Sequence, residues 1–373
     1  MAIHIVSVLA SMEMTESQKL FFELLLVSLN VKASLTRTPT EKEWEVILEE
    51  AQKQSIDGVL LSGLERLPEE QRPQKLFLLQ WIGLVQIAEQ NTRVIAQASS
   101  DVVQLFHNNG FACTLLKGVA VGRYYPVPER RQSGDVDIWL DGGRKKIYDF
   151  ARALSKSGRL EGVNYHHVKV DLLDDIEIEA HIWPSFLSSP LRNRRLHKFC
   201  NLHRPTMGTS MPSLAFDRVF ILLHCYMHMC GHGVGLRQIM DYFYVLKQGF
   251  TEEEKKDAVY WIEQLGMRRF ACGLMWVLQK YFGLEEKYQL MVPDEKEGQF
   301  IIQEVMQTGN MGHSDTRNWG SMKSPLSRFF HNLKRDVYLA KHYPHEALWQ
   351  PFFSIWLYCW RLSKGLLNDS DKD

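Results

Sequence analysis

A change of pattern near Gly110 constrains the fold more than any other feature of this chain. From Lys75 to Asn108 the sequence is a run of good helix formers with no proline and one glycine. Its apolar residues recur every three or four positions, which predicts a long amphipathic helix. Directly after Gly110, the short apolar run at 112–116 is typical of a buried strand. We therefore expect helices and strands within one protein.

Two more strand patterns and a helix follow the first strand. Residues 135–140 alternate polar and apolar at their start, and 144–156 carries its apolar residues on one helix face. A hairpin is expected where the strand-like segments 165–173 and 176–183 are joined by a polar pair, Asp174-Asp175. Strands mixed with one intervening helix predict a small mixed sheet.

Helical spacing returns after Pro205. The expected helices are 213–229, 236–247, 252–265, 268–282 and 328–343. The resulting prediction is an α+β fold with a sheet-containing core at residues 111–205, between helical regions at 1–110 and 206–373.

The charge and cysteine content limit the partners and the compartment. Lys and Arg number 44 and Asp and Glu number 44, so the formal net charge is zero, which argues against bulk nucleic-acid binding. The six cysteines form no CxxC pair, residues 1–10 lack the basic start of a secretion signal, and the apolar stretch 347–360 falls short of the ~20 residues that span a bilayer. We expect a cytoplasmic protein without a membrane span.

Three carboxylates are the candidate catalytic and metal-binding residues. Asp135 and Asp137 share one face of their strand, because alternate side chains of a strand point the same way. In the later strand, Glu179 lies on one face with Glu177 and His181, so it joins the pair if the two strands are neighbours. Such hard oxygen ligands suit Mg²⁺, and three of them can hold two ions for an in-line phosphoryl displacement. Glu177 is the alternative to Glu179.

A candidate phosphate site precedes the carboxylates. Lys117 and Gly118 lie where a strand is expected to turn into a helix, so the backbone can approach a phosphate there and the helix start offers free N–H groups. Lys117 and Arg131 would add positive charge against a triphosphate.

These segments resemble a known family. Residues Leu115–Gly118, Tyr124–Pro128 and Arg131–Ile138 are similar to the uncharacterised nucleotidyltransferase family of the DNA polymerase β-type superfamily, over roughly residues 75–250. The string Glu179-Ala180-His181 also resembles a Glu-x-His of that family. One departure is Val119, which stands after Gly118 where the superfamily has a serine that contacts a phosphate.

The resemblance implies a Mg²⁺-dependent nucleotidyltransferase with an NTP substrate and an unknown small-molecule or protein acceptor. It implies that Asp135, Asp137 and Glu179 are the catalytic and metal-binding residues, with two Mg²⁺ ions. The nucleotide-binding residues would be Lys117, Gly118, Arg131, Ser133 and Gly134.

Two other functions stay open at this point. The missing serine after Gly118 favours a non-catalytic module that binds a nucleotide or a protein on the same fold. His224, His228 and His232 recur at helical spacing, which also permits a zinc hydrolase, although histidines lining a cleft are the commoner case. On the next helix, Arg237 and Asp241 either contact the nucleotide or pair with each other four residues apart.

Overall fold

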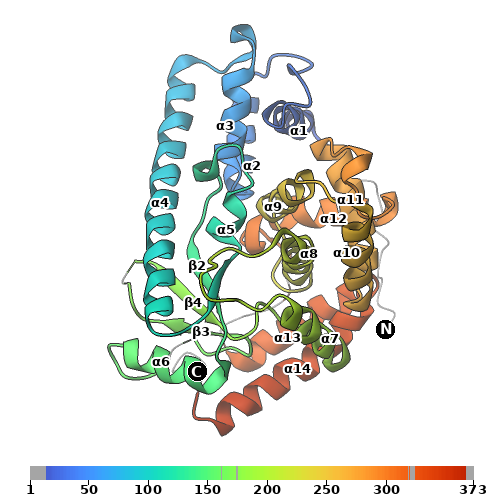
Figure 1. The fold of residues 1–373 in the computed structure, drawn as a ribbon. Helices are drawn as coiled ribbons and strands as arrows, with labels where there is room; N and C mark the ends of the chain where they lie inside the picture. Colours follow the sequence, from blue (N-terminus) through green and yellow to red (C-terminus); the bar gives the residue numbers. More distant parts are fainter. Residues whose placement is uncertain (1–13, 161, 174, 318, 320–323, 367–373) are drawn as a thin grey trace.

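The computed structural model describes residues 14–160, 162–173, 175–317, 319 and 324–366. Residues 1–10 and Asp174, on which expectations were placed, lie outside these ranges. A small sheet lies between one long helix and a large group of other helices (Figure 1). This arrangement confirms the α+β fold.

Helices make up both ends of the described chain. The N-terminal helices are α1 (Glu16–Ser28), α2 (Glu41–Lys53), α3 (Asp57–Arg66) and α4 (Lys75–Asn108). Around the strands lie α5 (Gly118–Gly122), α6 (Gly143–Leu154) and α7 (Pro190–Leu202). The C-terminal helices are α8 (Leu214–Cys230), α9 (Leu236–Lys247), α10 (Glu252–Gln264), α11 (Arg268–Phe282), α12 (Glu295–Thr308), α13 (Pro325–Leu339) and α14 (Pro344–Ser363).

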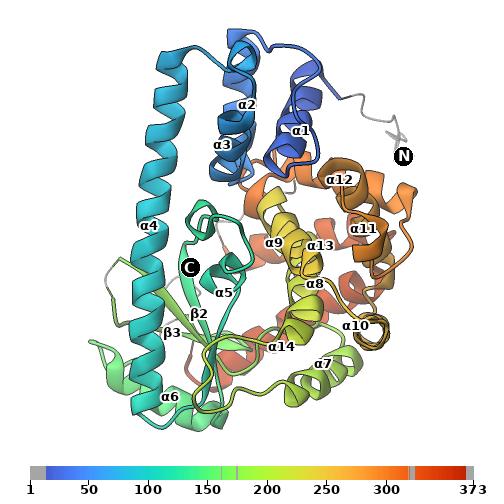
Figure 2. The same cartoon turned by 45° about the horizontal axis from the view of Figure 1, so that its top comes forward.

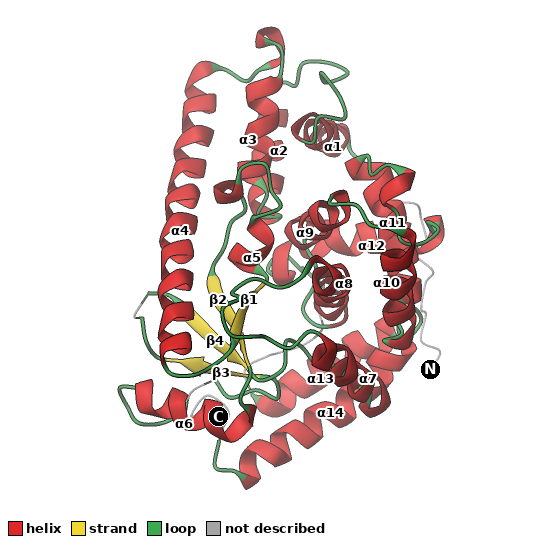
Figure 3. Cartoon of the chain, in the orientation of Figure 1, coloured by secondary structure: helices red, strands yellow, loops and turns green. Residues whose placement is uncertain are grey.

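The sheet has four strands in the order β1-β2-β4-β3. They are β1 (Cys113–Leu116), β2 (Asp135–Leu140), β3 (His167–Val170) and β4 (Glu177–His181). β1 and β2 run antiparallel, β2 and β4 run parallel, and β3 and β4 form the expected antiparallel pair. The sheet, drawn in yellow in Figure 3, is therefore mixed. Its two central strands, β2 and β4, carry the carboxylates.

Helix α4 covers one face of this sheet. It runs the length of the molecule beside α2, α3 and the strands (Figure 2). Its buried stripe includes Val102 and Phe106, which pack in one apolar cluster with Ile138 of β2 and Ile178 of β4. The alternation of these strands had placed Ile138 and Ile178 on the face away from the acidic residues, and burial of both confirms that assignment.

Helix α8 covers the opposite face, where the acidic residues lie. Trp139, which shares the face of Asp137 on β2, stacks on Phe216 at the start of α8 with ring centroids 5.6 Å apart. Phe216 in turn stacks on Phe220, one helical turn further along. This aromatic contact sets α8 against the sheet, so that His224, a turn beyond Phe220, faces the same space as the carboxylates.

The C-terminal helices differ from the expectation in two places. Helix α12 was not predicted from the sequence, and α13 begins at Pro325 rather than at residue 328 and ends at Leu339 rather than at 343. Ser324 caps α13 in a capping box with Ser327, and Pro344 begins α14 in the first-turn position that suits proline. Within the described ranges, no helix combines the length and apolar content needed to cross a bilayer.

Thr40 should contribute measurably to stability as the cap of α2. Its hydroxyl accepts from the Glu43 amide at 3.4 Å, and the Glu43 carboxylate accepts from the Thr40 amide at 2.8 Å, as the capping-box pattern predicts. A Thr40→Ala variant should lower the free energy of unfolding by about 1 kcal/mol in urea titrations. Lys42→Ala, an exposed change in the same turn, is the control and should leave stability unchanged.

Candidate active site

The pairing of β2 with β4 brings the three predicted carboxylates onto one face of the sheet. In the parallel register Asp137 lies opposite Glu179, and Asp135 lies opposite Glu177. Asp137 is buried and Glu179 is half-buried, whereas Glu177 is exposed and pairs with Lys169 at 2.7 Å. Glu179, rather than Glu177, therefore faces the cavity with the two aspartates.

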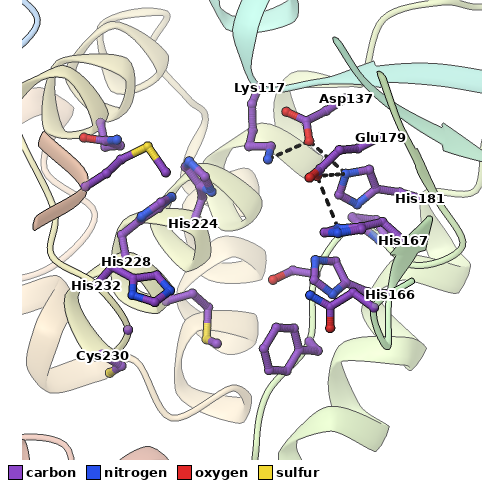
Figure 4. Close-up of a pocket in the computed structure, with 18 of the residues that line it drawn as sticks. Lys117, Asp137, His166, His167, Glu179, His181, His224, His228, Cys230 and His232 are labelled. Carbon is purple, nitrogen blue, oxygen red and sulfur yellow. Dashed lines mark hydrogen bonds and ion pairs between the residues drawn. The ribbon is translucent and has the colours of Figure 1, made fainter. Parts of the chain in front are cut away.

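Lys117 reaches the carboxylates from the end of β1. Its ammonium lies 2.7 Å from Oδ1 of Asp137, within the cavity shown in Figure 4. The lysine has a φ of 48°, which is rare for a residue with a side chain, and Gly118 follows with a φ of 33°. Strained backbone of this kind persists only where the surrounding contacts enforce it, and it is concentrated at functional sites. The turn from β1 into α5 thus aims Lys117 at Asp137.

Histidines surround the carboxylates on the sheet side. His181 Nε2 lies 2.8 Å from Oδ1 of Asp137 and 3.3 Å from Oε2 of Glu179, and His167 Nδ1 lies 3.2 Å from the same Glu179 oxygen. His166 packs against both rings (Figure 4). The sequence singled out His181 beside Glu179 but missed His166 and His167, whose only signal was their place at the start of a predicted strand.

The charges of this cluster are strongly coupled. The pKa of Asp135 is raised, chiefly because the Asp137 carboxylate repels its charge, and burial adds to this. For Asp137 burial also acts to raise the pKa, but the neighbouring Lys117 ammonium and the His181 hydrogen bond outweigh it and hold the pKa below its usual range. Burial acts to lower the pKa of His181, and its hydrogen bonds to Asp137 and Glu179 overcome that and raise it.

A second wall, from α8, faces the carboxylates across a cavity of about 460 Å³. His224 and His228 lie on it with ring centroids 4.4 Å apart, and His232 lines the cavity further along (Figure 4). Among the described residues, the groups suited to hold a metal are Asp137–Glu179–His181 and His166–His167–His181. The α8 histidines belong to neither group, so the zinc hydrolase interpretation gains no support.

Arg131, a predicted nucleotide-binding residue, binds the carboxylate of Asp241. Its guanidinium is 6% exposed and donates to both oxygens of Asp241 at 2.7 and 2.8 Å, while Tyr125 donates to the same carboxylate at 2.7 Å. Arg131 also donates to the Ser133 hydroxyl at 3.0 Å. Asp241 thus pairs with Arg131 rather than with Arg237, contrary to the pairing that the helical spacing of Arg237 and Asp241 allowed.

Arg237 instead bonds the loop before β2. Its guanidinium donates to the Gln132 carbonyl at 2.9 Å, and the residue lines the cavity together with Lys117, Gly118 and Asp135. Lys117, Arg131 and Arg237 therefore all line the cavity with the carboxylates, and Arg131 is also held by Asp241.

Comparison with known protein families shows which family the chain belongs to. Residues 40–283 match the model of a family described as uncharacterised nucleotidyltransferase. The chain belongs to this family. Neither the curated proteins nor the solved structures contain a match to it. The family match includes all four strands and helices α2–α11, whereas α13 and α14, which supply the far wall of the cavity through Asp336 and Glu346, lie beyond it.

Proposed function

We propose that the protein transfers a nucleoside monophosphate from an NTP to an acceptor hydroxyl or amine. The observation that carries the proposal is the convergence of Asp135, Asp137 and Glu179 on one cavity wall beside Lys117. The proposal places the carboxylates and Lys117 in residues 111–205, and the helical region 206–373 adds Arg237 and further cavity wall, with the helical region 1–110 on the other side. The cytoplasm, where NTPs are abundant and cysteines stay reduced, is the proposed location; the cysteines of the described chain are unpaired.

The carboxylates fit a divalent metal by their chemistry. Asp135 and Asp137 on adjacent same-face positions, with Glu179 opposite Asp137, present hard oxygen ligands that repel one another unless cations lie among them. In the proposal these three residues hold two Mg²⁺ ions. When bound, such ions neutralise charge on the attacking and leaving oxygens of an in-line displacement.

The chain's own groups then have defined tasks. Lys117 and Arg237 offer positive charge to the triphosphate, and Gly118 lets the phosphates approach the backbone at the start of α5. Ser133 and Gly134 form the loop against the triphosphate. Arg131 lines the same cavity and positions that loop through Ser133, and its direct contact with the triphosphate stays a prediction that the Arg131→Met variant tests.

The acceptor oxygen or nitrogen attacks the α-phosphorus, the bond from that phosphorus to the bridging oxygen breaks, and pyrophosphate leaves. Glu179 takes the acceptor proton, helped by its closeness to His167 and His181, which keep its charge in place. The cavity continues past His224 and His228 to α13 and α14, and this end is the proposed acceptor site.

The test is a screen of the four NTPs with Mg²⁺ against candidate acceptors, read as pyrophosphate release and as a mass increase of one nucleoside monophosphate on the acceptor. We expect release with at least one NTP. NTP binding without release for any acceptor or for the protein itself would favour the non-catalytic module, whose support is Val119 in place of the usual serine.

A further inference from the structure

We propose that the ion bound between Asp137 and Glu179 is a divalent transition-metal ion with imidazole ligands from His181 and His167, rather than Mg²⁺ bound by oxygen alone. The inference refines one metal position of the proposed transferase and rests on that site. It concerns binding, so it is tested without the transfer reaction.

The donor atoms already lie together. Asp137, Glu179 and His181 each present one ligand atom, and the three atoms lie within 4.8 Å of one another. His181 and Asp137 are both almost fully buried, which fixes their side chains at the base of the cavity. A cation entering this group meets two carboxylates and an imidazole nitrogen.

A second group extends the first through the same histidine. His166, His167 and His181 also present nitrogens within 4.8 Å of one another, and their ring centroids are 4.4 to 5.4 Å apart. His167 joins the two groups, because its Nδ1 lies 3.2 Å from the Glu179 carboxylate (Figure 4). The result is a continuous donor set of two carboxylates and three imidazoles.

One of these imidazoles has a buried nitrogen without a hydrogen-bond partner. Within the described residues, Nδ1 of His166 is inaccessible to solvent and accepts or donates no hydrogen bond, whereas Nδ1 of His167 faces the Glu179 carboxylate. Buried polar atoms are normally satisfied, so unsatisfied ones need an explanation. A cation in the cavity that His166 lines would supply the missing partner.

The donor chemistry separates the candidate ions. Mg²⁺ is a hard cation that takes oxygen ligands and keeps several waters, whereas imidazole suits transition ions such as Fe²⁺ and Zn²⁺. Two carboxylates and the His181 imidazole at one position, with the His167 imidazole beside the Glu179 carboxylate, therefore favour a transition ion. Lys117, whose ammonium contacts Asp137 Oδ1, is the cation that such an ion displaces from that oxygen.

Mn²⁺ is the probe for the experiment, because it is paramagnetic and reports its ligands. The full chain, stripped of metal and free of nucleotide, is titrated with Mn²⁺ and, separately, with Mg²⁺ by calorimetry. We expect Mn²⁺ to bind at least about tenfold more tightly, a difference of ~1.4 kcal/mol. Pulsed electron paramagnetic resonance should show coupling of the bound Mn²⁺ to imidazole ¹⁴N.

The variants locate the nitrogen ligands. His167→Ala should weaken Mn²⁺ binding about tenfold or more, with little effect on Mg²⁺, and should reduce the ¹⁴N coupling. His224→Ala removes an imidazole from the opposite wall of the same cavity and is the matched control, which should bind both ions as the wild type does. If His167→Ala fails to fold, the wild-type titrations and the wild-type ¹⁴N coupling still test the proposal.

The outcomes for the metal and for the transferase are separable. Bound Mn²⁺ without ¹⁴N coupling, or equal affinity for Mn²⁺ and Mg²⁺, overturns the metal proposal even if pyrophosphate is released. Nitrogen-coupled Mn²⁺ in a protein that releases no pyrophosphate supports the metal proposal and contradicts the transferase.

Discussion

An Asp135→Asn variant is expected to lose about 10³-fold in nucleotidyl transfer while unfolding at no lower urea concentration than the wild type. The loss follows because the side chain is a proposed metal ligand, and several kcal/mol of transition-state stabilisation correspond to such a factor. The retained stability follows from the repulsion by Asp137, which raises the Asp135 pKa. When the pKa of an acid is higher in the folded state than in the unfolded state, its ionised form lowers the free energy of unfolding. Replacing that carboxylate by a neutral amide therefore does not destabilise the folded protein.

Asp137→Asn should differ from Asp135→Asn in its stability, and this contrast distinguishes the roles of the two carboxylates. This carboxylate is the partner of Lys117 and His181, so its neutralisation leaves a half-buried ammonium without its counter-charge and lowers stability as well as activity. Asp141→Asn, just beyond β2 and 42% exposed, is the control and should keep both. Rates of pyrophosphate release and urea midpoints give the measurements. An Asp135→Asn protein with more than a tenth of wild-type activity would remove Asp135 from the metal site.

Arg131→Met is expected to lower the free energy of unfolding by about 3–5 kcal/mol, because it leaves the buried Asp241 carboxylate unpaired. Both side chains are nearly inaccessible, at 6% and 2%, and two hydrogen bonds join them. The pair connects the loop before β2 to α9, elements more than a hundred residues apart. Its loss should therefore loosen the loop that carries Ser133 and weaken NTP binding as a consequence.

A double variant separates the two roles considered for Arg131. Arg131→Met with Asp241→Leu removes both charges and should recover most of the lost stability in urea titrations. Asp257→Asn, an exposed carboxylate on α10, should change stability by no more than about 0.5 kcal/mol. An Arg131→Met protein of wild-type stability that fails to bind NTP would instead restore Arg131 as a direct triphosphate contact.

The local sequence pattern was sufficient to predict the bounds and the faces of single helices and strands. The long helix ends at Asn108, as the spacing of its apolar residues and the glycine beyond it predicted, and β2 spans the six residues expected. Period-two alternation correctly divided β2 and β4 into an apolar face and an acidic face, because the geometry of a strand fixes that division without reference to its neighbours. The choice of Glu179 over Glu177 needed the register of the two strands and the ion pair that Glu177 makes with Lys169.

Contacts between distant segments were decided only by the tertiary structure. The sequence placed Asp241 four residues from Arg237 and could not show that Arg131, 110 residues earlier, would take the carboxylate instead. For His166 and His167 it showed only a place at the start of a predicted strand, because their position at the site depends on the pairing of β3 with β4. Side chains on one element follow from periodicity, which is local. Ion pairs and donor clusters follow from how elements pack, and that packing is set by the whole apolar core.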